Sequence, residues 1–194
     1  MSDRLLNGCR VIAITNLLLL TGLAAAQPSV PTTRPFHLGF TRWPADLTRE
    51  GFLAAQDFAH QHGDIVGVMF IGGIPWPEAL ADQPFTSDVN SNLSYRPPRG
   101  KKLFLSISPL DRDRAGLAPY WGNKDNLPLP EPWKNLALNS DDVKTAYRKF
   151  VLRAVEAMKP DYLAIGIENN VLLSKSVDQW RQLVLLGHER HRLR

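Results

Sequence analysis

Four short apolar runs, separated by helical patterns or long polar links, most constrain the fold of this chain. The runs cover Phe36–Phe40, Asp64–Phe70, Lys102–Ile107 and Tyr162–Ile167. No two of them are joined by the tight turn that closes a β-hairpin. Strands that lack a hairpin pair in parallel through a crossover, which is usually a helix. The sequence therefore predicts an α/β fold with a parallel sheet.

Helical periodicity fills two of the crossovers and resumes after the last run. Gly63 ends the first helix, Ser140 stands where the N-cap of the second is expected, and Pro160 ends the second. Ser176 begins a capping box of the form S-x-x-Q. The expected helices cover Thr48–His62, a short segment near Glu78–Ala81, Asp141–Met158, and the residues from Ser176 to Leu186.

Small and bulky residues alternate along each predicted strand. In the last strand Ala164 and Gly166 share one face, and the bulky aliphatic residues share the other. A small-residue face suits a crowded barrel interior, and a bulky face suits a layer beneath helices. The alternation predicts a parallel (β/α)4 half of a TIM barrel, incomplete. The same parity directs Glu168 inward at the C-terminal end of its strand, where barrel enzymes carry catalytic groups.

Residues 1–26 have the pattern of a secretory signal peptide. Arg4 and Arg10 precede the apolar stretch Val11–Leu23, and Ala24-Ala25-Ala26 resembles a cleavage site. We therefore expect a secreted or periplasmic protein that keeps no membrane segment after cleavage. An uncleaved anchor is the alternative, although the apolar stretch is short for a membrane span. Residues 27–35 are Pro-rich and read as a linker, which leaves 36–194 as the folded domain.

Charge and cysteine content exclude several classes of protein. The chain has 194 residues and a formal net charge of +4, and its Lys and Arg residues are scattered rather than clustered. We therefore expect no nucleic-acid partner. The lone Cys9 lies in the predicted signal segment, and the His residues show no ligand spacing. No metal site and no cofactor are expected.

Aromatic residues follow the predicted strands. Trp43 follows the first strand, Trp76 the second and Trp121 the third. The C-terminal ends of parallel strands meet at one edge of a sheet, so these rings are expected to lie on one rim. Aromatic faces around a cleft in a secreted protein are typical of carbohydrate binding. The alternative is that the Trp rings only cover the top of the barrel.

Polar residues complete this predicted rim. Arg42 precedes Trp43, and Glu168 is followed by Asn169 and Asn170. Arg42 and the two amides are expected to bind substrate hydroxyls beside Glu168. The alternatives are that Glu168 caps the next helix or pairs with Arg42, and that the two Asn residues form an Asx turn.

At Tyr162–Glu168 and Leu117–Gly122 the chain resembles the clan of (β/α)8-barrel glycoside hydrolases. It is most similar to the secreted endo-β-1,4-galactanase type, over roughly Phe36 to Leu186. The resemblance implies that Glu168 is the acid/base Glu at the end of the fourth strand. It also implies hydrolysis of a β-linked polysaccharide as the parent activity.

The chain departs from this clan in two ways. Ile167 stands where the clan has Asn before the acid/base Glu. The residues left after the signal segment are too few for a complete barrel of about 250 residues. The strand that would carry the nucleophile is therefore missing, and retaining hydrolysis needs two carboxyl groups about 5 Å apart.

Three classes of function remain open. The first is a truncated, inactive glycosidase-like chain that self-associates through its open barrel edges. The second is a non-catalytic secreted carbohydrate-binding protein. The third is a small secreted α/β domain with no role in sugar binding.

Overall fold

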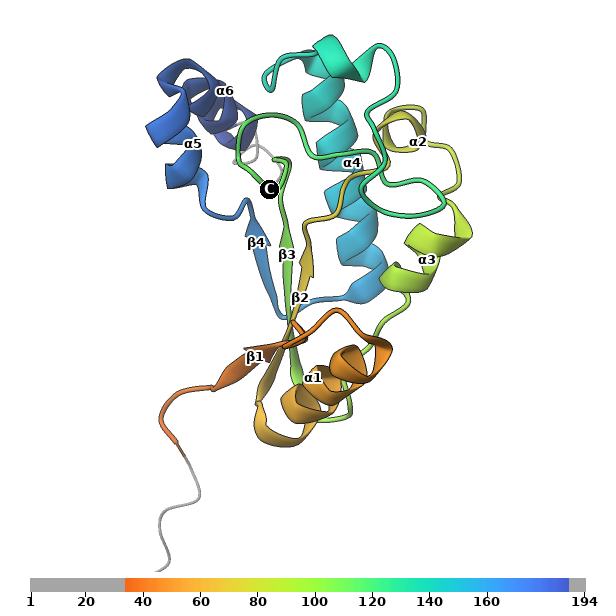
Figure 1. Ribbon diagram of the computed structural model, residues 1–194, viewed down its shortest axis with the longest axis vertical. Helices are drawn as coiled ribbons and strands as arrows, with labels where there is room; N and C mark the ends of the chain where they lie inside the picture. The colour runs from red at the N-terminus through yellow and green to blue at the C-terminus, as the bar shows by residue number, and fades with distance from the viewer. Residues whose placement is uncertain (1–33, 189–194) are drawn as a thin grey trace, which may run out of the picture. The chain divides into compact units, whose positions relative to one another are not determined.

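The computed structural model describes residues 34–188, so the predicted signal peptide and nearly all of the predicted linker lie outside the described residues. Figure 1 labels the helices and strands. In chain order they are β1 (Gly39–Thr41), α1 (Arg49–His62), β2 (Ile65–Phe70), α2 (Trp76–Leu80), α3 (Ser87–Leu93), β3 (Lys102–Ile107), the 3-10 helix η1 (Trp133–Asn135), α4 (Asp141–Met158), β4 (Tyr162–Ile165), α5 (Asn169–Lys175) and α6 (Val177–His188).

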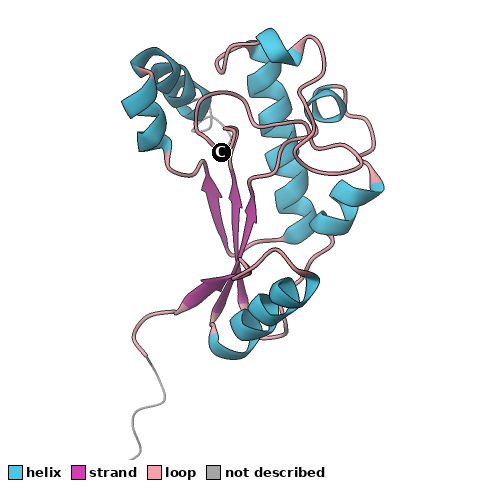
Figure 2. Cartoon of the chain, in the orientation of Figure 1, coloured by secondary structure: helices cyan, strands magenta, loops and turns pink. Residues whose placement is uncertain are grey.

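The four strands form one parallel sheet in the order β1-β2-β3-β4 (Figure 2). The predicted α/β class and the parallel pairing are confirmed. Each strand lies beside its neighbour in sequence, and the order never reverses. The described part of the sheet therefore ends in two edge strands, β1 and β4, each paired on one side only.

Helices α1 and α4 pack on the same face of the sheet. Phe58 of α1 meets Phe40 of β1 edge-on, with 5.0 Å between ring centroids. Tyr147 of α4 donates a hydrogen bond of 2.8 Å to the carbonyl of Ile107 in β3. The strand register places Phe40 and Ile107 on one face. On the opposite face Phe104 remains 37 % exposed.

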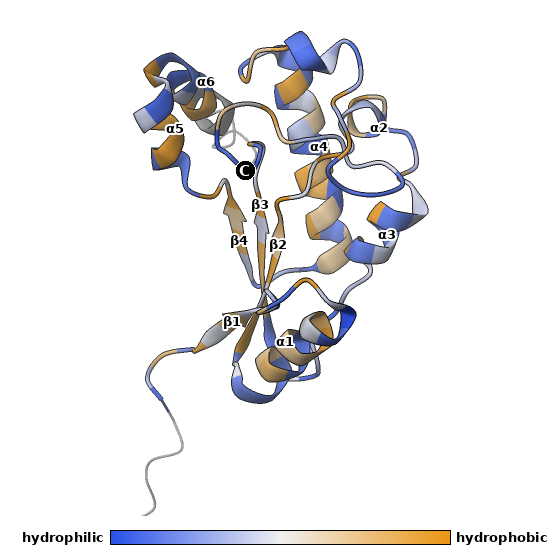
Figure 3. Cartoon of the chain, in the orientation of Figure 1, coloured by the Kyte–Doolittle hydropathy of each residue, from blue (hydrophilic) through white to orange (hydrophobic). Residues whose placement is uncertain are grey.

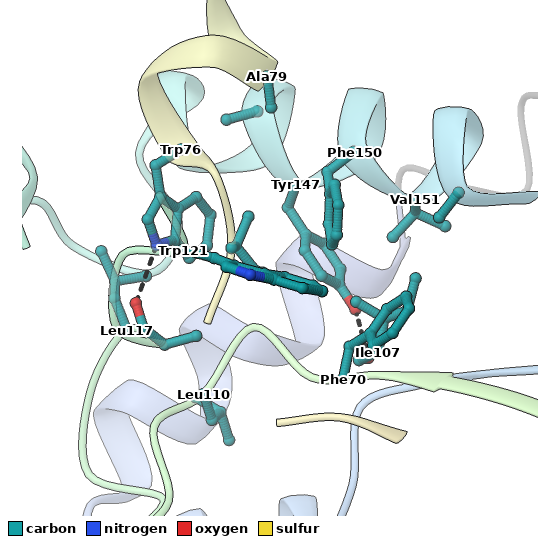
Figure 4. Close-up of a cluster of buried hydrophobic side chains, with 14 of the residues drawn as sticks. Phe70, Trp76, Ala79, Ile107, Leu110, Leu117, Trp121, Tyr147, Phe150 and Val151 are labelled. Carbon is teal, nitrogen blue, oxygen red and sulfur yellow. Dashed lines mark hydrogen bonds between the residues drawn. The ribbon is translucent and has the colours of Figure 1, made fainter. Parts of the chain in front are cut away.

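The core lies between the centre of the sheet and α4 (Figure 4). Phe150 of α4 has no exposed surface and contacts Phe70 and Trp121. Lys149 of the same helix donates to the carbonyl of Leu80, which ties α2 to α4. At the margin, by contrast, Figure 3 shows hydrophobic residues along β4, where three of the four side chains are exposed.

The strand ends differ from the sequence-based prediction in three of the four strands, and β2 differs only in beginning at Ile65 rather than Asp64. β1 covers Gly39–Thr41 rather than Phe36–Phe40, because its pairing begins opposite Ile65. β4 ends at Ile165 instead of Ile167. Gly166 follows with a φ of 106°, in the left-handed region that favours glycine, and this turns the chain out of the strand. β3 has the predicted bounds.

Two short helices were not predicted. α3 lies in the long link between β2 and β3, where only a helix near Glu78–Ala81 was expected; that helix is α2. α3 begins at a cap, because the hydroxyl of Thr86 accepts from the amide of Val89. α5 begins only one residue after Glu168, where a loop was expected.

The predicted helix caps are partly confirmed. Ser176 accepts from the amide of Gln179 at 3.3 Å, and Thr48, which was not predicted as a cap, accepts from that of Gly51 at 3.0 Å. Ser140 lies at the N-cap of α4, but its hydroxyl makes no capping hydrogen bond. Within the described residues, no helix is long and apolar enough to cross a membrane.

Candidate functional site

A cleft lies beyond the C-terminal end of β2, against the side of α1. Its main part has a volume of about 650 Å³, and an adjoining hollow has about 330 Å³. The two share Trp43, Phe52, Met69, Phe70 and Asn92, so we treat them as one feature and name it the Trp43 cleft. Its polar lining comprises Thr41, Arg42, Gln56, Asp88, Asn92, Arg112, Lys124, Asp125 and Asn126.

The three predicted Trp residues differ in what they can contact. Trp43 is 57 % exposed, so its ring is open to a ligand in the cleft. Trp121 also lines the cleft but is only 4 % exposed. Its indole N–H donates to the carboxylate of Asp88 at 2.7 Å, which fixes the ring in the cleft wall.

Trp76 does not lie on the predicted rim. It has no exposed surface and stacks on Trp133 with 5.4 Å between ring centroids. Its indole N–H donates to the carbonyl of Ala118 at 2.9 Å (Figure 4). The role expected for Trp76 in sugar binding is therefore corrected to one in packing, because a ring without exposed surface offers no face to a ligand. Its position after a strand in the sequence could not show that its ring is buried.

Arg42 lines the hollow beside Trp43. One of its terminal nitrogens donates to the amide oxygen of Gln56 at 3.0 Å, and its guanidinium lies 3.9 Å from the ring centroid of Tyr95. Burial lowers the pKa of Arg42, and its contact with Tyr95 acts in the opposite direction. The phenol of Tyr95 is in turn 2.8 Å from the imidazole of His60.

Glu168 lies outside the Trp43 cleft. It is the N-cap residue of α5, with a φ of 51°, and its side chain is 61 % exposed. The parity argument fails here because β4 ends at Ile165 and the chain turns at Gly166. The side chain makes no capping hydrogen bond to α5, contrary to one of the alternatives.

Glu168 forms an ion pair with Arg114, not with Arg42 as one alternative had it. The distance between the guanidinium and the carboxylate is 3.2 Å. Arg114 is only 7 % exposed and also donates to the carbonyl oxygens of Asp111 and Arg112, at 2.7 and 3.0 Å. The loop after β3 therefore holds the carboxylate.

The two amides after Glu168 behave differently. Asn169 packs against Gly166, where an added Cβ would come within 2.6 Å of its side-chain nitrogen. The side-chain oxygen of Asn169 is buried and makes no hydrogen bond to the described residues. Asn170 is exposed. Neither residue lines the Trp43 cleft.

The predicted rim is thus divided into two groups. Trp43, Arg42 and Trp121 lie at the cleft, and Glu168 lies with its two amides beside Arg114. The segment from Asp111 to Arg114 links the groups, because Arg112 lines the cleft while Arg114 binds Glu168. No role in the site was predicted for this segment. Its position directly after β3 was the signal that could have identified it.

In the part of the chain that the structure covers, no cluster of three or more His, Cys, Asp or Glu side chains is placed to hold a metal ion. No protein-family model, no curated protein and no solved structure matches this chain.

Proposed function

We propose that residues 36–188 form the first half of a (β/α)8 barrel of the glycosidase type. Its parent activity is hydrolysis of a β-linked polysaccharide, with Glu168 as general acid/base. The observation that carries this proposal is the sheet order. Four parallel strands follow one another without reversal, two helices pack on one face, and Glu168 follows the end of β4. A doubly wound sheet would reverse its strand order and carry helices on both faces.

The isolated chain is expected to lack turnover. Retaining hydrolysis needs a second carboxylate about 5 Å from the first, and the resemblance assigns that group to a seventh strand. The described sheet has four strands. We also propose that a second copy of the chain pairs with its open edges. A barrel closed by two copies would carry Glu168 after its fourth and eighth strands. The seventh strand would still lack the second carboxylate, so this dimer is also expected to be inactive.

Non-catalytic carbohydrate binding is the second candidate function. It is favoured by the separation of the two groups, because Glu168 is held by Arg114 and does not line the cleft with Trp43. In this case the cleft alone would bind sugar. Both candidates place a saccharide on the exposed face of Trp43.

A binding experiment tests the saccharide site that both candidates share. Oligosaccharides of β-1,4-galactan should change the Trp fluorescence of the purified protein, and Trp43→Ala should weaken binding at least tenfold. Leu152→Ala is the matched control, because Leu152 is similarly exposed but belongs to α4 and does not line the cleft. Equal affinity of the Trp43→Ala variant and the unchanged protein would remove the cleft from the proposal.

Variants of Glu168 separate the two candidates. If Glu168 descends from an acid/base residue, a chain of several sugars should reach from Trp43 to it, and Glu168→Gln should weaken binding of long oligosaccharides more than of disaccharides. If the cleft alone binds sugar, Glu168→Gln should bind long oligosaccharides and disaccharides as tightly as the unchanged protein does. Hydrolysis of galactan that vanishes in Glu168→Gln would contradict the expected inactivity and would show that a complete site assembles.

A further inference from the structure

Arg42 carries a charge that the described residues do not neutralise. Its polar partners are the amide of Gln56 and the phenol ring of Tyr95, both neutral, and no carboxylate in residues 34–188 pairs with it. Its Nε atom is buried and has no hydrogen-bond acceptor there. A partly buried cation without an anionic partner is unfavourable, so an incoming anion would be stabilised at this position.

The hollow beside Arg42 has the polarity expected of an anion site. None of the described residues that line it is acidic. Asn92 and Gln56 offer amide groups, and Trp43 with Phe52 offers apolar surface. The side chain of Arg42 is already oriented by Gln56 and by stacking on Tyr95, so little conformational freedom is lost when a ligand binds. The acidic residues of the cleft, Asp88 and Asp125, line its other part, together with Arg112 and Lys124.

We propose that the hollow beside Arg42 binds the carboxylate of an acidic sugar, so that the Trp43 cleft recognises a uronate-bearing glycan. The guanidinium would receive the carboxylate while the exposed ring of Trp43 contacts the sugar. The saccharide part of this inference rests on the proposed function. The anion part rests on Arg42 and its neutral partners alone.

A comparison of charged and neutral ligands tests the inference. Trigalacturonate should bind at least tenfold more tightly than galactotriose, as measured by calorimetry or Trp fluorescence, and added salt should weaken the charged ligand only. Arg42→Gln should remove this preference, whereas Arg42→Lys should retain part of it, because the charge remains while the planar fork is lost. Acetate at the same concentration tests whether a carboxylate without a sugar suffices.

Arg153→Gln is the matched control. Arg153 also lies over an aromatic ring, 3.3 Å from the centroid of Phe85, but does not line the cleft. The Arg153→Gln variant should bind each trisaccharide with the same affinity as the unchanged protein. Circular dichroism and melting temperature identify any variant that fails to fold. If Arg42→Gln does not fold, the affinity of Arg42→Lys and the salt dependence of trigalacturonate binding to the unchanged protein test the inference.

Three results would overturn the inference. Equal affinity for the charged and neutral trisaccharides would refute it while leaving the proposed function intact. If acetate binds as tightly as trigalacturonate and its binding depends on Arg42, the saccharide part of the inference is refuted. That result would also count against the proposed function. Failure of the folded protein to bind either trisaccharide would refute both.

Discussion

The centre and the margins of the sheet differ in how completely they are covered. Leu105 and Ile107 of β3 have no exposed surface and belong to one buried cluster with Trp121 and the inner residues of α4. In β4, Leu163 and Ile165 are each 39 % exposed, and Phe58 of α1 is 50 % exposed. The centre of the sheet is therefore fully buried, whereas its margins expose apolar surface that a larger assembly would bury.

This contrast leads to the largest expected effect, a difference in stability between the two regions. Phe150→Ala should lower the free energy of unfolding by about 3–5 kcal/mol, because it leaves a cavity among Phe70, Phe85 and Trp121. Phe58→Ala, at the margin, should cost about 1 kcal/mol, since the residue is already 50 % exposed. Urea unfolding measures both. Equal losses would show that the margin is packed like the centre.

Sequence reasoning succeeded where a pattern depends on local physics. The apolar runs identified all four strands, and the bounds of β3 are as predicted, because Leu103, Leu105 and Ile107 form the buried face of this central strand. The parallel pairing also followed from the sequence, since no hairpin turn was present. The edge strands were placed less well because their ends depend on tertiary pairing, as with β1 opposite Ile65.

The candidate site was predicted less completely. Position after a strand could not separate Trp43 from Trp76, because burial of a ring is decided by contacts distant in sequence, such as the hydrogen bond from Trp76 to Ala118. The inward direction expected for Glu168 assumed that the strand continued through Ile167. The left-handed turn at Gly166 ended it earlier and brought Glu168 to Arg114.

The second expected effect concerns association through the margins. Two copies that pair through β1 and β4 would bury the exposed side chains of the edge strands. Ile165→Lys should therefore weaken self-association at least tenfold, about 1.4 kcal/mol, because it places a charge on the edge. Sedimentation velocity at micromolar concentration measures this. Leu152→Lys is the control, because Leu152 is also exposed but belongs to α4 and forms no sheet edge. A protein that is monomeric before substitution would contradict the proposal.

The third expected effect concerns the ion pair at the end of β4. Glu168→Gln leaves Arg114, whose side chain is 9 % exposed, without its anionic partner. The carboxylate itself is largely exposed and Arg114 keeps two carbonyl acceptors, so the loss should be about 1 kcal/mol. Asp178→Asn, in an exposed pair with Arg181 on α6, should cost less than about 0.5 kcal/mol. Equal losses would mean that Arg114 does not depend on Glu168.

The smallest expected effect is a pH dependence that distinguishes Tyr120, beside the central layer, from Tyr95, whose ring contacts Arg42. Burial, a hydrogen bond to Glu78 and the charge of Glu78 raise the pKa of Tyr120 to about 12. The phenol of an unfolded chain ionises near pH 10. The folded state thus retains a proton that the unfolded state loses, so this contribution to stability is complete below about pH 10 and is lost as the pH rises toward 12.

Replacing either phenol isolates its own contribution to the pH dependence of stability. Tyr120→Phe should flatten the fall in unfolding free energy between pH 10 and pH 11.5, as measured by urea unfolding. Tyr95→Phe should have less effect, because burial raises the pKa of Tyr95 but the nearby charge of Arg42 opposes the increase. A steeper pH dependence in Tyr120→Phe than in Tyr95→Phe would show that the phenol of Tyr95, rather than that of Tyr120, is held more firmly in its neutral form.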